Sequence, residues 1–319
     1  MSEADGVELQ QWLELLQSQR VGDRLIAIKA LQHLGDEAAI EPLILTLQDD
    51  SSAVQKLAVS ALWEFANPKA VPALVKVLAV ADPSVREEAQ SALAELISSD
   101  DLLLLLDALQ QNDTNLQLSV LILLRKIHDV QALPYILPFL QSGDPALREA
   151  AVTTVRYLNQ VDRCPPVLDL LNDPAATVRR EVVLTLGHLA DQGVIPALGQ
   201  ALLHDVDWQV RRNAAKALAI YDAVESIPYL DHALQDEHWQ VRKFATKALQ
   251  KTADDRALPN LMQALIDETS DVRKEAAIAL GKLNNFAALQ GLQQALDDPD
   301  REVSIFAQRA IDQLKQINH

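Results

Sequence analysis

The 319-residue sequence is poor in cysteine, aromatic residues, glycine and long apolar stretches. Its single cysteine, Cys164, cannot form an internal disulfide or a CxxC-type zinc or iron–sulfur site. Aromatic residues make up 4% and there are only 9 glycines, which argues against a β-sandwich or β-barrel with glycine-rich turns. An apolar run such as Leu102–Leu106 falls far short of the roughly 18 residues that a membrane-spanning helix needs.

Basic residues are also in deficit, with 28 Lys and Arg against 45 Asp and Glu and a net charge of −17. A chain this acidic is repelled by a phosphate backbone, so we expect no general binding of nucleic acid. The first residues, MSEADGVELQ, lack the basic start and apolar stretch of a signal peptide. We therefore expect a soluble cytoplasmic protein without membrane insertion.

What the sequence does contain is an internal repeat of about 31 residues. Segments of the form D-x-x-V-R-x-x-A-x-x-A-L-x-x-L recur, as in DPSVREEAQSALAEL from Asp82 and DWQVRRNAAKALAIY from Asp207. We take the Val of V-R as position 0 of each repeat and number the ten repeats in chain order. Successive positions 0 are 31 residues apart, with one interval of 32. They fall at Asp23, Val54, Val85, Leu116, Leu147, Val178, Val210, Val241, Val272 and Val303.

Each repeat predicts two amphipathic helices of about 12 residues. In the second helix, positions 0, +4, +7, +8 and +11 are apolar, as in Val85 and Leu93, and they share one face at 100° per residue. A proline near the start marks the first helix, where its missing N–H costs nothing. An aspartate such as Asp82, Asp144 or Asp173 can cap the second helix. The marking prolines are Pro42, Pro72, Pro134, Pro166, Pro196, Pro228 and Pro259.

Two such helices cannot bury both of their apolar faces alone, and stacking of the next repeat completes the core. The sequence therefore predicts an all-α, right-handed α-solenoid of about ten two-helix repeats. No linker or low-complexity segment interrupts it, so we expect one continuous superhelix over residues 1–319 without separate domains.

The D-x-x-V-R…A-x-x-A-L repeat resembles the short HEAT repeat, specifically the variety named after phycobilisome lyases, from about Val7 to Leu314. The resemblance implies that the second helix of each repeat lines a concave surface. It is specific for the fold and weak for function, because such repeats occur in scaffolds, lyases, chaperones and adaptors. The lyases of this family hold a linear tetrapyrrole in a concave groove.

Position +1 holds arginine in seven of the ten repeats, and Gln55, Gln117 and Ser304 fill the others. These arginines either form a structural ladder, each bonding a turn aspartate and carbonyls of adjacent repeats, or present a row of anion-binding guanidiniums. Repetition in nearly every repeat favours the ladder. They are Arg24, Arg86, Arg148, Arg179, Arg211, Arg242 and Arg273.

The sequence carries none of the familiar catalytic motifs, such as G-x-G-x-x-G, G-x-x-x-x-G-K-[ST], H-E-x-x-H or G-x-S-x-G. The histidines are not paired at metal-ligand spacing, and we interpret Cys164 as a small hydrophobe rather than a reactive thiol. We predict no catalytic residue, no metal site and no cofactor. We expect a bilin cofactor and a bilin lyase activity only if the resemblance extends from the fold to the function.

Candidate binding residues lie at positions +2, +6 and +10 of the second helices, which face away from the core or flank it. In repeats seven to nine, seven of these nine positions are basic and none is acidic. The row is either a solvated face that balances the turn aspartates, or a patch that docks an acidic partner or ligand carboxylates. Tyr157 and His188 hold position +10 in repeats five and six and join the candidates. The basic residues are Arg212, Lys216, Lys243, Lys247, Lys251, Lys274 and Lys282.

Trp208 and Trp239 occupy the same position, two residues before position 0, in repeats seven and eight. Equivalent positions in stacked repeats lie one helix spacing apart, so we expect the two indoles to be neighbours. They either cap turns, as is common in the family resembled, or form an aromatic rim for a ligand or partner, and we include them in the candidate site. Trp63 is instead interpreted as packed.

Three functions stay open. The first is a non-catalytic scaffold, adaptor or assembly factor that binds protein partners with an acidic surface on its concave face. The second is a phycobilin lyase or a chromophore-handling chaperone for phycobiliproteins. The third is a stabilising scaffold for an iron–sulfur carrier whose cluster the partner holds. The scaffold leads, because no feature of the sequence demands a bilin.

Overall fold

The computed structural model describes residues 3–252 and 254–316, with side chains from residue 7 onward. It forms two compact units, Met1–Gln160 and Val161–His319, which we call the N-terminal and C-terminal units and describe one at a time. Every regular element within the described residues is an α-helix or a short 3₁₀ helix, which confirms the predicted all-α fold. None of the described helices is both long and apolar enough to cross a membrane.

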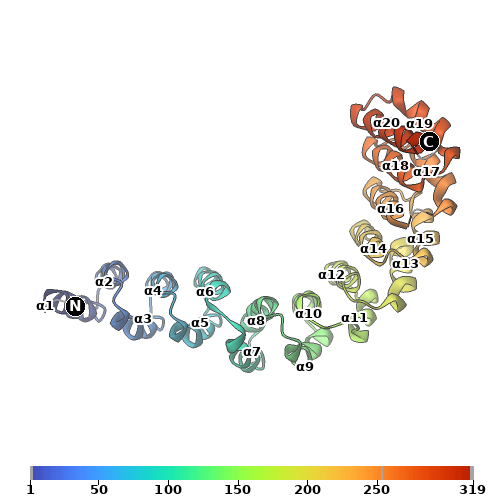
Figure 1. The fold of residues 1–319 in the computed structure, drawn as a ribbon. Coiled ribbons are helices and arrows are strands. Elements are labelled where there is room, and N and C mark those ends of the chain that lie inside the picture. The colour runs from blue at the N-terminus through green and yellow to red at the C-terminus, as the bar shows by residue number, and fades with distance from the viewer. Residues whose placement is uncertain (1–2, 253, 317–319) are drawn as a thin grey trace. The chain divides into compact units, whose positions relative to one another are not determined.

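In the N-terminal unit the helices form two rows (Figure 1). The even-numbered helices pack in succession, α2 on α4, α4 on α6, α6 on α8 and α8 on α10, and each also packs on the odd-numbered helix before it. The helices are α1 Glu3–Leu15, α2 Val21–Leu34, α3 Ile40–Thr46, α4 Ser52–Phe65, α5 Val71–Val77, α6 Pro83–Leu96, α7 Leu102–Leu109, α8 Thr114–Ile127, α9 Leu133–Ile136 and α10 Pro145–Tyr157.

The C-terminal unit repeats this arrangement, with α12, α14, α16, α18 and α20 packed in succession. Its helices are α11 Pro165–Asp169, α12 Ala176–Leu186, α13 Ile195–His204, α14 Trp208–Tyr221, α15 Ile227–Ala233, α16 Trp239–Thr252, α17 Leu258–Ala264, α18 Ser270–Leu283, α19 Leu289–Gln294 and α20 Arg301–Gln316. Each unit is therefore an α-solenoid. The single superhelix over both units stays a prediction.

The even-numbered helices are the second helices of the predicted repeats, and their position 0 faces the core. The apolar residue there is buried in every repeat from the second to the tenth, from Val54 at 0% exposure to Leu147 at 6%. Positions +4 and +8 follow the same face, as Ala89 and Leu93 show. The 31-residue period is thus the period of core burial, which confirms the predicted repeat.

The first helices are shorter than the predicted 12 residues. From α3 onward the odd-numbered helices have between 4 and 10 residues. Most follow a three-residue 3₁₀ turn, which takes the place of the first helical residues. In α9, Pro134 stands at the start as predicted, but Pro138 lacks the N–H that would continue the α-helical ladder, and residues 137–141 form a 3₁₀ helix.

The turns before the second helices confirm two of the three predicted caps. The carboxylates of Asp82 and Asp144 accept hydrogen bonds from the amides of Ser84 and Ala146 at the starts of α6 and α10. Asp173 instead lies two residues earlier in its repeat, at position −5, and the cap position of α12 is held by Ala175. Counted from position 0, Asp173 is equivalent to the clamp aspartates described below rather than to the capping residues.

The second helices end in a shared way that the repeat pattern did not predict. Position +12 adopts the left-handed conformation in five repeats, at Gly35, Ala66, His128, Asp222 and Asn284. Only one of these residues is the glycine that tolerates this conformation without strain. His128, Asp222 and Asn284 are also of types enriched in this conformation, so local preference supports the chain reversal everywhere but at Ala66.

Candidate functional site

The arginines at position +1 clamp each repeat to the next, and Arg242 shows the geometry. Its Nη1 donates to the backbone oxygen of Asp236 at 2.9 Å, six residues earlier. Its Nε and Nη2 donate to the two carboxylate oxygens of Asp267 in the next repeat, at 2.6 and 2.9 Å. The side chains of Arg242 and Asp267 are 9% and 10% exposed. A buried bidentate pair of this kind fixes both the distance and the orientation of two helices.

The same clamp recurs at five junctions where the next repeat carries aspartate at position −5. The pairs are Arg24–Asp49, Arg179–Asp205, Arg211–Asp236, Arg242–Asp267 and Arg273–Asp298. The structural ladder is thus confirmed for these five arginines. Their guanidiniums are occupied internally and do not form an anion-binding row.

The clamp is interrupted within the N-terminal unit. Position −5 is Val80, Gln111 and Ser142 in repeats three to five, and the facing residues are Gln55, Arg86 and Gln117. Arg86 donates to the backbone oxygens of Val80 and Ala81, both at 2.7 Å, and within the described residues it has no carboxylate within 4.0 Å. Gln55 and Gln117 likewise reach only backbone oxygens, at 2.8 Å from those of Asp49 and Gln111.

The clamps predict that stability falls in acid. In the folded protein the hydrogen bonds from Arg273 hold the pKa of Asp298 below its ordinary value of 3.8. The unfolded chain therefore takes up this proton first, so the stabilisation is complete above about pH 4 and is lost as the pH falls through the lowered pKa. We expect the melting temperature to drop over this range, and Asp298→Asn to flatten that part of the profile. An unchanged profile in the variant would contradict this linkage.

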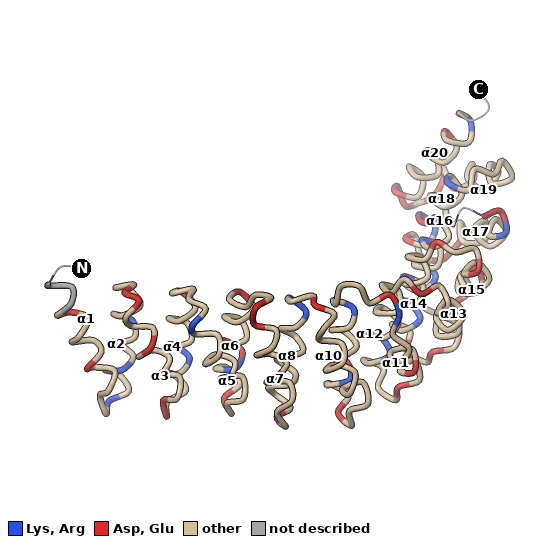
Figure 2. Tube along the Cα trace, turned by 60° about the horizontal axis from the view of Figure 1, so that its bottom comes forward, with Lys and Arg blue, Asp and Glu red and all other residues tan. Residues whose placement is uncertain are grey.

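The basic row of repeats seven to nine, whose Lys and Arg segments are blue in Figure 2, divides into two parts. At position +2 two of the three charges are neutralised, because Lys243 Nζ lies 2.7 Å from Asp271 and Lys274 Nζ lies 2.8 Å from Glu302, whereas Arg212 donates to the Asn213 side-chain oxygen. Both acids belong to the following repeat, at the start of its second helix. Counting positions along one helix does not reveal these two acids as partners. Comparing position +2 of one repeat with position −1 of the next repeat does.

The other part is a groove, which we call the lysine groove: Lys216, Ile220, Phe244, Lys247, Lys251 and Lys282. Its volume is about 300 Å³, and it lies along α14, α16 and α18. Lys216 Nζ lies 4.3 Å from the centroid of the Phe244 ring. Among the described residues, no carboxylate lies within 4.0 Å of any of its four lysines.

The charged form of Lys216 is disfavoured in the lysine groove. Burial lowers the pKa of Lys216, and the charges of Arg212 and Lys247 lower it further. The neighbouring Gln250 is buried, donates to the carboxylate of Glu275, and lies 3.5 Å from Lys282 Nζ through its Oε1. The groove is therefore a positively charged site with an apolar floor and one buried amide.

The ring that stacks on Trp208 is that of His238. Trp208 stacks on the His238 ring at a centroid distance of 3.8 Å and an angle of 6°. Arg212 lies 5.3 Å from the Trp208 ring and Lys243 lies 5.8 Å from the Trp239 ring. No ring contact joins the two indoles within the described chain, and the expectation that they lie one helix spacing apart stays a prediction. The residue before Trp239 takes the place beside Trp208.

The two remaining candidates, Tyr157 and His188, each take part in a contact between a histidine ring and a backbone oxygen. Tyr157 belongs to the N-terminal unit, where its side chain is 43% exposed and its backbone oxygen lies 2.7 Å from His128 Nδ1. His188 follows α12 in the C-terminal unit, with Nδ1 2.8 Å from the backbone oxygen of Leu184. Trp63 is 39% exposed rather than packed, and its Nε1 donates to Glu95 at 2.9 Å.

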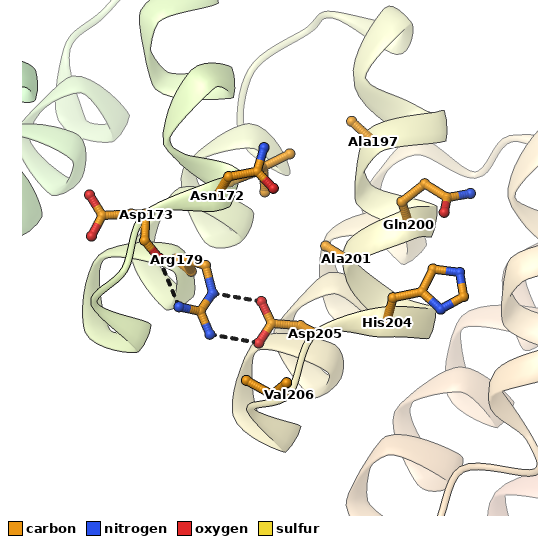
Figure 3. A pocket seen from close by; sticks show the side chains of 10 residues that line it. Asn172, Asp173, Arg179, Ala197, Gln200, Ala201, His204, Asp205 and Val206 are labelled. Atoms are coloured by element: carbon orange, nitrogen blue, oxygen red, sulfur yellow. Dashed lines mark hydrogen bonds and ion pairs between the residues drawn. The ribbon is translucent and has the colours of Figure 1, made fainter.

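A larger pocket of about 610 Å³ lies between the turn after α11 and helix α13 (Figure 3). Its charged groups already serve the ladder, because Arg179 donates to Asp205 and to the backbone oxygen of Asp173. His204 turns away from Asp205 in this view. Equivalent pockets of about 300 and 250 Å³ occur beside Arg242 and Gln55. The pocket is therefore a consequence of the repeat geometry, and we do not assign a function to it.

Cys164 precedes α11 and is buried, with 5% exposure. Burial raises the pKa of its thiol, which outweighs the hydrogen bond from the Val167 amide. A buried thiol with a raised pKa is a weak nucleophile. The interpretation of Cys164 as a small hydrophobe is confirmed.

Three stretches of the sequence, residues 9–97, 164–238 and 230–312, match the family of HEAT repeats. They cover more than half of the chain, which therefore belongs to the HEAT-repeat family. No curated protein matches the sequence. As many as 407 chains of solved structures match, so the fold does not single out one function.

Three solved structures illustrate the likeness. An engineered protein is 22% identical, with 97% of this chain and 99% of that chain covered and a TM-score of 0.55. Kap121p is 15% identical, with 98% and 42% covered and a TM-score of 0.63. A structure that describes Kap95p binding to RanGDP is 13% identical, with 98% and 52% covered and a TM-score of 0.65. At these identities the likeness concerns the fold alone.

Proposed function

We propose that the protein is a non-catalytic scaffold or adaptor that binds an acidic protein partner through the second helices of its C-terminal unit. The observation that carries the proposal is the lysine groove, whose four lysines have no internal carboxylate partner in the described chain of a protein with net charge −17. The Trp208–His238 stack and Trp239 border the same helices and add flat apolar surface of the kind found at binding hot spots.

The proposal predicts that charge reversal in the groove slows association. The partner is first identified by capture on the immobilised full chain and mass spectrometry. Lys247→Glu with Lys251→Glu should then lower the association rate by about tenfold, because a local positive field steers an acidic partner. The wild-type affinity should fall as salt rises. Trp239→Ala should act on the dissociation rate instead, as a desolvated anchor does.

The matched control reverses charge on the N-terminal unit, with Glu87→Lys and Glu95→Lys at positions +2 and +10 of repeat three. This control should leave association nearly unchanged. If it abolishes binding while the lysine reversal has no effect, the working surface lies in the N-terminal unit and the proposal is wrong.

A phycobilin lyase or a chromophore-handling chaperone of the phycobilisome-lyase-like HEAT type is the second candidate. It is favoured by one observation, that the groove combines an apolar floor with amines able to pair with the propionates of a bilin. Co-expression with bilin-producing enzymes tests it, since a pigment that co-purifies would replace the protein partner as the ligand. A role as scaffold for an iron–sulfur carrier stays a prediction that no contact described above favours.

A further inference from the structure

The lysine groove differs from the other grooves of the C-terminal unit in its charge balance. The grooves beside Arg179 and Arg242 contain the aspartates that neutralise them. In the lysine groove the described acids near α16 and α18 are already used: Asp271 and Glu302 bind the lysines at position +2, and Glu275 binds Gln250. Glu275 binds a neutral amide and keeps its charge, but no described carboxylate lies within 4.0 Å of the four lysines, so ligand carboxylates can bind them directly.

The spacing of the four lysines matches the spacing of carboxylate side chains along a short extended peptide. Lys216 and Lys247 hold position +6 on adjacent helices, and Lys251 and Lys282 hold position +10 on the next pair. Positions four residues apart on a helix are separated by about 6 Å, and packed helices by about 9 Å. In an extended peptide, side chains at alternate positions lie about 6.6 Å apart on one face. Two or three acidic residues within a few positions can thus each meet a different lysine.

The apolar floor of the groove favours a ligand that makes apolar contacts as well as ionic ones. Ile220 is 52% exposed at position +10 of α14, and Phe244 lies half-buried beneath Lys216. A purely anionic ligand would leave this apolar surface in contact with water. A ligand with one apolar side chain between its carboxylates would cover it, and about 300 Å³ admits only one or two side chains.

From these observations we infer that the lysine groove recognises a short, extended acidic segment of the partner, with one apolar side chain placed over Ile220 and Phe244. The inference rests on the proposed function and names the element of the partner that is bound. A nucleic acid fits less well, because the charged groups at the starts of α18 and α20 include the exposed carboxylates of Glu268 and Glu302. These carboxylates would repel a phosphate chain that extends beyond the groove.

The test uses the full-length protein and a fluorescein-labelled peptide, Gly-Asp-Glu-Leu-Asp-Glu-Gly, with binding followed by fluorescence anisotropy. Replacement of its leucine by glycine should weaken binding about tenfold, because the buried apolar area is lost. Replacement of its acids by Asn and Gln should abolish binding. An oligothymidylate of equal charge should bind at least tenfold more weakly than the peptide, and tighter binding of the oligonucleotide would overturn the inference.

Two groove variants and one control localise the peptide. Lys247→Glu with Lys251→Glu should abolish binding, whereas Lys29→Glu with Lys69→Glu changes the net charge equally at exposed sites of the N-terminal unit and should stay within about twofold. Ile220→Ser should weaken the leucine peptide about fivefold and leave the glycine peptide unchanged. Circular dichroism of each variant checks that the solenoid is folded.

The outcomes separate the two proposals. If the leucine and glycine peptides bind equally and Ile220→Ser has no effect, the inferred apolar recognition is wrong, while loss of partner association in the lysine variant still supports the scaffold function. If the captured partner binds the Lys247 and Lys251 variant as well as wild type, the scaffold function at this face fails, and the inference fails with it.

Discussion

Deletion of residues 211–241 is expected to leave a folded protein that is shorter by one repeat. The deletion joins Val210 to Arg242, and both the core positions and the clamps stay in phase. Arg242 then has the backbone oxygen of Asp205 six residues before it, the group that Arg211 now contacts, and it keeps Asp267 ahead of it. Because stability in such arrays is the sum of repeats and nearest-neighbour interfaces, one interior repeat can be removed without unfolding the rest.

Deletion of α14 alone, Trp208–Tyr221, is expected to have the opposite result. It removes half a repeat and leaves the apolar faces of α12, α13 and α16 without the helix that they pack against. This variant should aggregate and lose ellipticity per residue, whereas the in-phase deletion should keep both its ellipticity and a single species in light scattering. Equal behaviour of the two variants would contradict the modular interpretation.

Arg242→Ala should be among the most destabilising single substitutions outside the apolar core. It leaves the buried carboxylate of Asp267 without its bidentate partner, and loss of one member of a buried pair costs about 3–5 kcal/mol. Denaturant titration gives the free energy of unfolding of the C-terminal unit. Hydrogen exchange should show faster exchange of the α16 and α18 amides than in wild type.

The matched control is Arg86→Ala, because Arg86 holds the same position and contacts backbone oxygens only. Its loss should cost about 1 kcal/mol, in line with ordinary hydrogen bonds. A cost for Arg86→Ala equal to that for Arg242→Ala would mean that the carboxylates contribute nothing beyond the backbone contacts. Neither substitution touches the lysine groove, so peptide binding should persist in both variants where they are folded.

The sequence predicted those features that repeat in register. Burial of position 0, the prolines of the first helices and the role of arginine at position +1 each follow from one period and one helical phase. The interruption of the clamp could also have been found, since an alignment of positions −5 places Val80, Gln111 and Ser142 where other repeats have aspartate.

Features that depend on contact between repeats were harder to predict. Which acid meets Lys243, and which ring meets Trp208, depends on the offset between stacked helices and on side-chain rotamers. The pattern of residues along a single helix determines neither the offset between stacked helices nor the side-chain rotamers. For the same reason, the sequence did not predict which lysines of the basic row are paired. Lys243 and Lys247 look equivalent in sequence, but only Lys243 has an acidic neighbour.

The interrupted clamp gives the N-terminal unit a mechanical character of its own. A stack of repeats under load behaves as springs in series, and the most compliant junctions take most of the extension. The junctions beside Gln55, Arg86 and Gln117 lack the bidentate pair that resists sliding and tilting of one helix on the next. We therefore expect the junctions between α4 and α10 to be the more compliant part of the N-terminal unit, and the arginine–aspartate pairs that brace α14 to α20 to resist widening of the lysine groove.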